Sequence, residues 1–125
     1  MMKLSFFVPI AVAAMTLSGC DGSTPSDGPG TVTAALISPN GAEGAAVVDV
    51  AGTVEDITGS SGVSVYTTQS ATGTRVILVR MTPGNLEMSF RTQDVSRPPN
   101  ISVIEVADGD DAIRASLTGY RVEFR

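Results

Sequence analysis

The single cysteine, Cys20, is the residue with the most distinctive chemical setting in this sequence. It follows an apolar run, Leu4 to Leu17, and two small residues, Ser18 and Gly19. Together with the positive charge of Lys3, these segments have the order of an export signal and its cleavage site. A membrane-spanning helix needs about 20 apolar residues, which is more than this run provides. The pattern therefore favours a cleaved signal peptide over a permanent transmembrane helix. If Cys20 has no role of its own, the leader is an ordinary secretory signal with a cysteine nearby by chance.

The four residues Leu17-Ser18-Gly19-Cys20 resemble the lipobox of bacterial lipoproteins. In that family the cysteine is lipidated and becomes the first residue of the mature protein, so the resemblance implies a diacylglyceryl group with palmitate-type chains on Cys20. Each buried methylene contributes about 0.8 kcal/mol, and two acyl chains anchor a protein stably where one binds reversibly. With Cys20 used in this way, no thiol is left for a disulfide, for catalysis or for a metal site.

The residue after the cysteine bears on localisation. Asp21 resembles the signal that retains enterobacterial lipoproteins on the inner membrane. We therefore expect a lipid-anchored protein of the bacterial cell envelope, on the periplasmic face of the inner membrane. The outer membrane is the alternative, since organisms differ in this sorting rule.

The sequence divides into three parts: residues 1–19 as signal peptide, 20–30 as lipidated cysteine and flexible tether, and 31–125 as one domain. The tether segment has no large apolar residue, so it has nothing to bury and is expected to be disordered. Ten such residues span about 17 Å on average, and at most roughly 35 Å when extended. The domain is therefore expected to stay close to its membrane.

Charge and composition exclude several classes of function. The whole chain carries −5, and loss of Lys3 with the leader leaves seven arginines against thirteen carboxylates, or −6. Such a domain repels nucleic acid and anionic headgroups. After the leader there is no histidine and no lysine, which removes the Ser-His-Asp triad, histidine metal ligands and Schiff-base chemistry. We therefore expect no nucleic-acid binding and no enzymatic activity.

The remaining pattern is β throughout. Short runs rich in Val, Ile, Thr and aromatic residues alternate with turn residues, at the spacing of a sandwich or barrel. Leu86, Met88 and Phe90 predict one buried strand face, and the continuous apolar run Val76 to Val79 predicts a central strand covered on both sides. We predict an all-β domain, a single immunoglobulin-like (cohesin-like) antiparallel β-sandwich of about seven strands. The segment Arg97 to Asn100 is expected to cross between sheets.

The order of four segments is similar to short uncharacterised bacterial lipoproteins, which look like reduced relatives of cohesin and carbohydrate-binding-module sandwiches. The segments are Leu36 to Gly41, Gly44 to Val48, Arg75 to Val79 and Val106 to Asp110. The resemblance implies the sandwich fold and covers nearly the whole domain. It consists of strands and turns, so it transfers no binding residue.

Two acidic groups are candidate sites. Asp108, Asp110 and Asp111 surround a glycine and could offer oxygen ligands to Ca²⁺, but they lack the downstream glutamate of an EF-hand loop. The alternative is a solvated turn in which the aspartates accept local backbone hydrogen bonds. Glu55 and Asp56 are adjacent, so on a strand they point to opposite faces and make no catalytic pair. Apart from the lipid on Cys20, we expect no cofactor.

These observations lead to one preferred function and two alternatives. The preferred function is a non-enzymatic binding module near the membrane, which contacts an envelope protein by strand addition at an exposed sheet edge. A glycan-binding module is the first alternative, although sugar-binding faces usually use exposed aromatic side chains and tryptophan is absent. A small hydrolase is the second, and the missing His, Lys and free Cys disfavour it.

Overall fold

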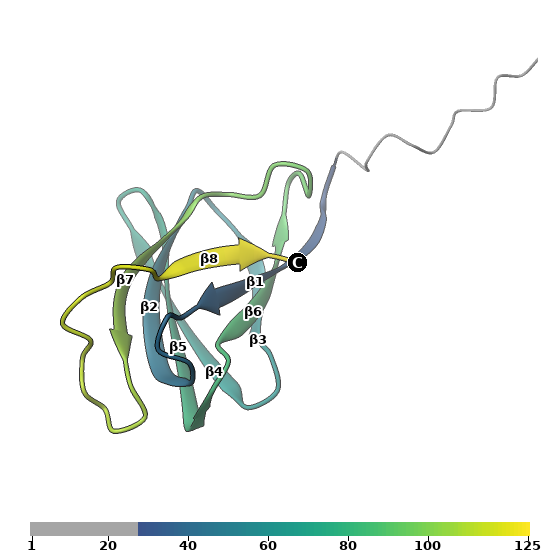
Figure 1. Cartoon of the computed structure of the whole chain (residues 1–125). Coiled ribbons are helices and arrows are strands. Elements are labelled where there is room, and N and C mark those ends of the chain that lie inside the picture. Colours follow the sequence, from purple (N-terminus) through teal and green to yellow (C-terminus); the bar gives the residue numbers. More distant parts are fainter. Residues whose placement is uncertain (1–27) are drawn as a thin grey trace, which may run out of the picture.

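A computed structural model of the chain describes residues 28–125, which form eight β-strands and no helix (Figure 1). The strands are β1 (Gly30–Ile37), β2 (Glu43–Ala51), β3 (Glu55–Gly59), β4 (Val63–Ser70), β5 (Gly73–Gly84), β6 (Glu87–Thr92), β7 (Ile101–Ala107) and β8 (Arg121–Phe124). The prediction of an all-β domain is confirmed.

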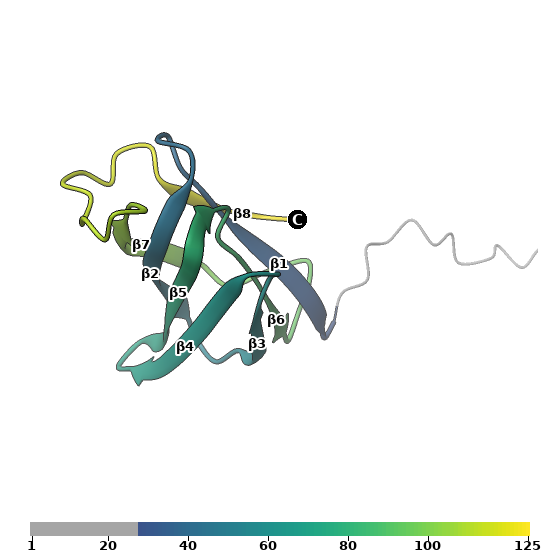
Figure 2. The same ribbon diagram turned by 90° about the horizontal axis from the view of Figure 1, so that it is seen from below.

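The strands form two antiparallel sheets of four. One sheet has the order β3-β6-β1-β8 and the other β4-β5-β2-β7, and the two pack face to face (Figure 2). The pairing is nested along the chain: β4 pairs with β5, β3 with β6, β2 with β7, and β1 with β8. This architecture confirms the antiparallel sandwich.

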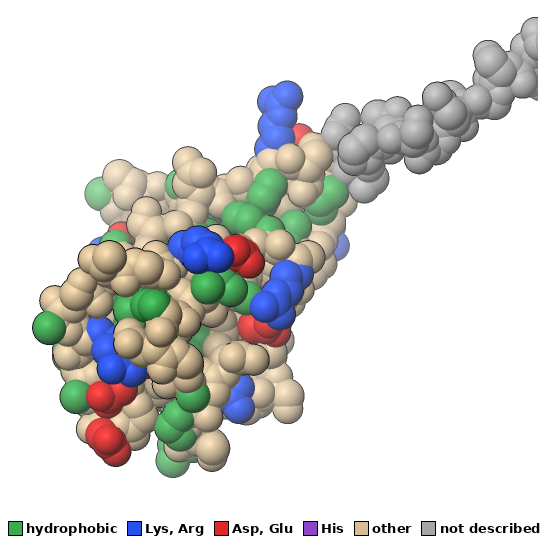
Figure 3. All heavy atoms as spheres, viewed as in Figure 1, with side chains coloured by type: hydrophobic (Ala, Val, Ile, Leu, Met, Phe, Trp, Pro, Cys, Tyr) green, Lys and Arg blue, Asp and Glu red, His purple; other side chains and the backbone are tan. Residues whose placement is uncertain are grey.

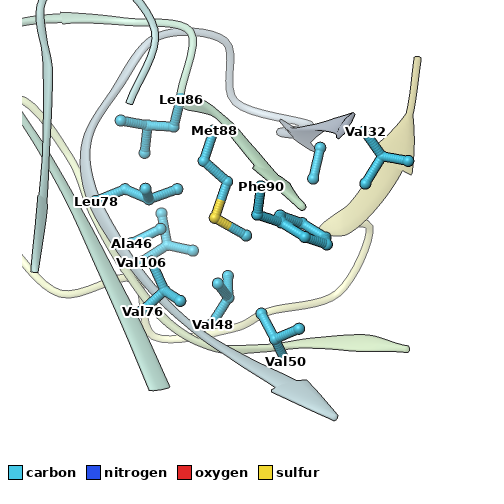
Figure 4. Packing of buried hydrophobic residues seen from close by; sticks show 11 residues of the cluster. Val32, Ala46, Val48, Val50, Val76, Leu78, Leu86, Met88, Phe90 and Val106 are labelled. Atoms are coloured by element: carbon cyan, nitrogen blue, oxygen red, sulfur yellow. The ribbon is translucent and has the colours of Figure 1, made fainter. Parts of the chain in front are cut away.

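The core lies between the two sheets, where side chains from alternating positions meet. Met88 and Phe90 of β6 are fully buried, together with Leu86 just before the strand, as the alternation predicted. They pack against Val48 of β2 and Leu78 of β5 (Figure 4). A strand directs successive side chains to opposite faces, so each of these strands buries one set and leaves the other outside.

The strand that the sequence did not predict is β3, which makes eight strands instead of about seven. Its segment, Glu55–Gly59, contains one apolar residue, Ile57, and therefore lacks a hydrophobic alternation. The register with β6 shifts between Glu55 and Thr58, where Asp56 has a positive φ of 54°. The irregularity is a bulge, which obscures the period of two in the sequence.

The connections between the strands include a tight hairpin turn and a crossing between the two sheets. Ala71 and Thr72 form the two-residue turn of the β4–β5 hairpin. The segment 93–100 connects β6 in one sheet to β7 in the other, so the Pro98-Pro99 crossing is confirmed. In the segment between β7 and β8, Ile113 forms an isolated bridge with Ala107 at the end of β7.

The continuous apolar run of β5 is covered on one side, contrary to the prediction. Val76 and Leu78 are buried in the core, whereas Ile77 and Val79 are half-buried on the outer face of the sheet. In β8 the side chains that face the core are only partly covered. Val122 packs against the core, but Phe124, at the end of this edge strand, remains 37% exposed.

Candidate interaction surface

The lipobox residues Leu17, Ser18, Gly19 and Cys20 and the sorting residue Asp21 lie outside the described residues. Lipidation and membrane sorting therefore stay predictions from sequence. The described domain begins at Gly28, close to the first strand. Among its residues no helix is long and apolar enough to cross a membrane.

The acidic turn adopts the geometry of a self-capped loop. Oδ1 of Asp108 accepts hydrogen bonds from the backbone N–H groups of Asp110 (2.8 Å) and Ala112 (3.0 Å). These two bonds lower the pKa of Asp108 below its usual value. Asp110 and Asp111 are exposed, and within residues 28–125 no three His, Cys, Asp or Glu side chains gather as a metal site would require. Asp108 thus stabilises the turn through backbone hydrogen bonds.

A buried carboxylate that the sequence analysis missed binds the segment that follows the acidic turn. Glu43 is 1% exposed, although it starts strand β2. Its Oε1 accepts hydrogen bonds from Nη2 (2.7 Å) and Nε (3.2 Å) of Arg114. Its Oε2 accepts from Ser38 (3.0 Å) and from the hydroxyl of Tyr120. Asn40 donates to the same hydroxyl at 2.8 Å, which ties the β1–β2 turn to the segment before β8.

The electrostatics of Glu43 are those of a structural anchor. Burial raises the pKa of Glu43, but hydrogen bonds from Arg114, Tyr120 and Ser38 outweigh that effect and leave the pKa below its usual value. The hydrogen bond to Glu43 in turn raises the pKa of Arg114. Because both carboxylate oxygens are occupied, the group is held ionised and joins two loops.

A cavity of about 280 Å³ opens beside this anchor, between the β1–β2 turn and the short β5–β6 connection. Its charged lining residues are Glu43, Glu87 and Arg125. Glu43 is bound to Arg114, and Glu87 forms an ion pair with Arg125 at 2.5 Å. The charged groups of the cavity are thus engaged with protein partners.

Pairing of arginines with carboxylates recurs over the domain surface. Arg75 contacts Asp49 through two hydrogen bonds of 2.7 and 2.9 Å across β5 and β2, and Arg121 contacts Glu123 within β8. On the face that carries β8, basic and acidic side chains lie next to one another (Figure 3). Four arginines, Arg75, Arg114, Arg121 and Arg125, are therefore paired with carboxylates, whereas Arg80 donates to the carbonyl oxygens of Thr82 and Asn85.

Three of the four sheet edges carry features that discourage further strand pairing. Strand β3 is short, acidic at Glu55 and Asp56, and bulged. Strand β8 has four residues, two of them charged. Strand β7 has a register shift against β2, and its end is covered where Arg114 N–H donates to the carbonyl of Val106.

The fourth edge, β4, has none of these features. Its eight residues, Val63–Ser70, include no charge and no proline, and they pair with β5 in unbroken register. Within residues 28–125, β4 has a neighbouring strand in its sheet on one side only. About half of its backbone N–H and C=O groups therefore point away from β5. The side chains of residues 66–69 are exposed.

The outer face of the same sheet continues this edge as an apolar row. Tyr66 of β4 lies opposite Ile77 of β5, which in turn lies opposite Val47 of β2. Tyr66 is 61% exposed, and Ile77 and Val47 are half-buried. Farther along the sheet, Ala45, Ala107 and Ile113 line a shallow apolar depression. We define the β4 edge with the Tyr66–Ile77–Val47 row as the candidate interaction surface.

Comparison with known proteins adds no assignment, because no family model, curated protein or solved structure matches this chain.

Proposed function

We propose that this protein is a non-enzymatic, lipid-anchored protein of the bacterial cell envelope, whose β-sandwich binds a protein partner by strand addition at β4. The observation that carries the proposal is the contrast among the four edges: β3, β7 and β8 are short, charged, bulged or covered, and β4 is none of these.

The physical reason lies in the backbone of an edge strand. Unpaired N–H and C=O groups form a template for another strand, and natural proteins block edges that have no partner. An added strand gains main-chain hydrogen bonds along β4, and its alternate side chains contact the outer and inner faces of the sheet. On the outer face the first contact is Tyr66, whose ring offers a large apolar area at low entropic cost.

The anchor supports a partner close to the membrane. The lipobox-like Leu17 to Cys20 and the apolar leader carry this part of the proposal, together with the short segment between Cys20 and β1, which has no large apolar residue. The domain is acidic, so the lipid and not the charge of the domain attaches it to an anionic membrane. The partner is therefore expected at the same membrane, with the periplasmic face of the inner membrane as the proposed location.

Site-specific photocrosslinking in living cells tests the proposal. Full-length protein carries photoreactive benzoylphenylalanine in place of Tyr66, and a matched variant carries it in place of Ile104. Ile104 is the control because it is also an exposed residue of an edge strand in the same sheet. Protein adducts that form from position 66 and not from position 104 support the proposal. No adduct from position 66, or equal adducts from both positions, would overturn it.

A further inference from the structure

We infer that the strand added to β4 is β4 of a second copy, paired antiparallel about a two-fold axis to make one continuous eight-stranded sheet. The inference rests on the proposed function and specifies its partner. It follows from the charge, the side-chain composition and the length of β4.

Charge is the first argument, because a two-fold axis pairs the strand with a copy of itself, so any charge on the strand occurs on both sides of the contact. The chain carries −5, so two copies repel each other except where the contact is neutral. Residues 63–70 contain no ionisable group other than the Tyr66 hydroxyl. The same symmetry at β3 would place four carboxylates, Glu55 and Asp56 of each copy, along one short strand pair, and like charges close together destabilise such a pair.

Side-chain composition is the second argument. An axis near the middle of β4 passes close to Thr67 and places Val65, Thr67 and Gln69 against one another on the inner face. On the outer face it brings Tyr66 next to Thr68 or Tyr66 of the second copy. Cross-strand pairs of threonines, and of aromatic with β-branched residues, are among those that stabilise sheets. The Tyr66–Ile77–Val47 row then continues from one copy into the other.

Length is the third argument, and it also says where the dimer forms. Eight residues at about 3.3 Å each give an edge of roughly 26 Å. One strand pair of this length buries less than the ~800 Å² per partner of a standard interface. Pairing is therefore weak between copies in dilute solution. A shared membrane raises the effective concentration of anchored copies, so we place the dimer there.

Thiol crosslinking in intact cells tests the inference with the full-length protein. Thr67→Cys puts a thiol at an exposed position near the proposed axis, and Ser102→Cys puts one at an exposed position on the opposite edge, β7. The unsubstituted chain controls for Cys20, the one natural cysteine. A short bifunctional thiol reagent is added to the cells, and the products are identified by intact mass.

The products separate the inference from the proposed function. A product of twice the chain mass from Thr67→Cys, above the level of Ser102→Cys and of the unsubstituted chain, supports the inference. A product with a different protein overturns the inference and leaves strand addition standing. If neither product forms and position 66 also gives no photoadduct, both the inference and the proposed function are overturned.

A charge-swap experiment gives a second readout that only self-pairing satisfies. Two copies carry donor and acceptor fluorophores, and energy transfer between them is measured in cells. Thr67→Lys in both copies, or Thr67→Glu in both, is expected to remove the transfer by like-charge repulsion, and Thr67→Lys with Thr67→Glu is expected to restore it. Equal thermal unfolding of the variants shows that the fold is kept. Transfer that is unaffected by like charges overturns the inference.

Discussion

Glu43 and Arg114 lie 71 positions apart in the sequence, and the arginine donates two hydrogen bonds to one oxygen of the buried carboxylate. The pair connects the start of β2 to the long segment between β7 and β8. Because Tyr120 and Ser38 bind the second oxygen, Glu43 joins the β1–β2 turn to the segment before β8.

Glu43→Ala is therefore expected to destabilise the domain. Loss of one partner from a buried ion pair costs about 3 kcal/mol, and here it also frees Tyr120 and Ser38. Urea unfolding followed by circular dichroism gives the free energy. The matched control is Glu123→Ala, which removes an exposed ion pair with Arg121 and should change stability little. Equal effects of the two substitutions would contradict the assigned role of Glu43.

The same carboxylate makes stability depend on pH in the acid range. The pKa of Glu43 in the folded state lies below its usual 4.5, because hydrogen bonds from Arg114, Tyr120 and Ser38 exceed the opposing effect of burial. Its contribution is complete above the unfolded pKa and is lost as pH falls through the lower folded pKa. The free energy of unfolding, measured from pH 7 to pH 2.5, should fall below about pH 4.5. In Glu43→Gln the fall should be shallower, and an unchanged slope would contradict this assignment.

Substitutions at two adjacent positions of β5 test which face of the sheet is covered. Leu78→Ala leaves a cavity between the sheets and should cost about 2–5 kcal/mol. Ile77→Ala removes a half-buried side chain from the outer face and should cost clearly less. Thermal and urea unfolding of the two variants measure the difference. Equal losses would mean that another layer covers Ile77.

The acidic turn should behave as a backbone cap. In Asp108→Ala the N–H groups of Asp110 and Ala112 lose their acceptor, so the melting temperature is expected to fall. Asp110→Ala removes a charge from the same turn and serves as the control. Calcium at millimolar concentration should leave the melting temperature of the unsubstituted protein unchanged. A calcium-dependent rise that Asp108→Ala abolishes would instead support the hypothesis of a metal site at this turn.

The fold was predictable wherever hydrophobic period and burial coincide. Leu86, Met88 and Phe90 alternate cleanly, and the structure buries all three. The strand β3 was not predictable in this way, because a bulge at Asp56 interrupts its period and only Ile57 is apolar. The run Val76 to Val79 predicted a strand covered on both sides, and this prediction was wrong for the opposite reason. An apolar residue on an open outer face has the same sequence signal as one covered by a second layer.

The sequence predicted the kind of candidate surface, an exposed sheet edge, but not the strand that forms it. An edge available for strand addition was expected, but which strand lies at an edge depends on pairings between distant segments, such as β2 with β7. The Glu43 anchor was missed because its partners Arg114 and Tyr120 are 71 and 77 positions away. One signal was present: Glu43 is a lone charge among small residues from Gly41 to Ala46.

The nested pairing of the strands also sets an order in which the chain can fold. Ser70 and Gly73 of the central hairpin are three positions apart, whereas Ala34 of β1 pairs with Phe124 of β8, ninety positions later. Closing a longer loop costs more chain entropy, and contacts between distant residues slow folding. We expect β4 and β5 to associate first and β8 last. Pulse-labelled hydrogen exchange should then protect the β4–β5 hairpin before the backbone N–H of Arg125, which donates to the carbonyl of Thr33. One side of β1 can pair early with β6, whereas the side that faces β8 stays open until the last step of folding.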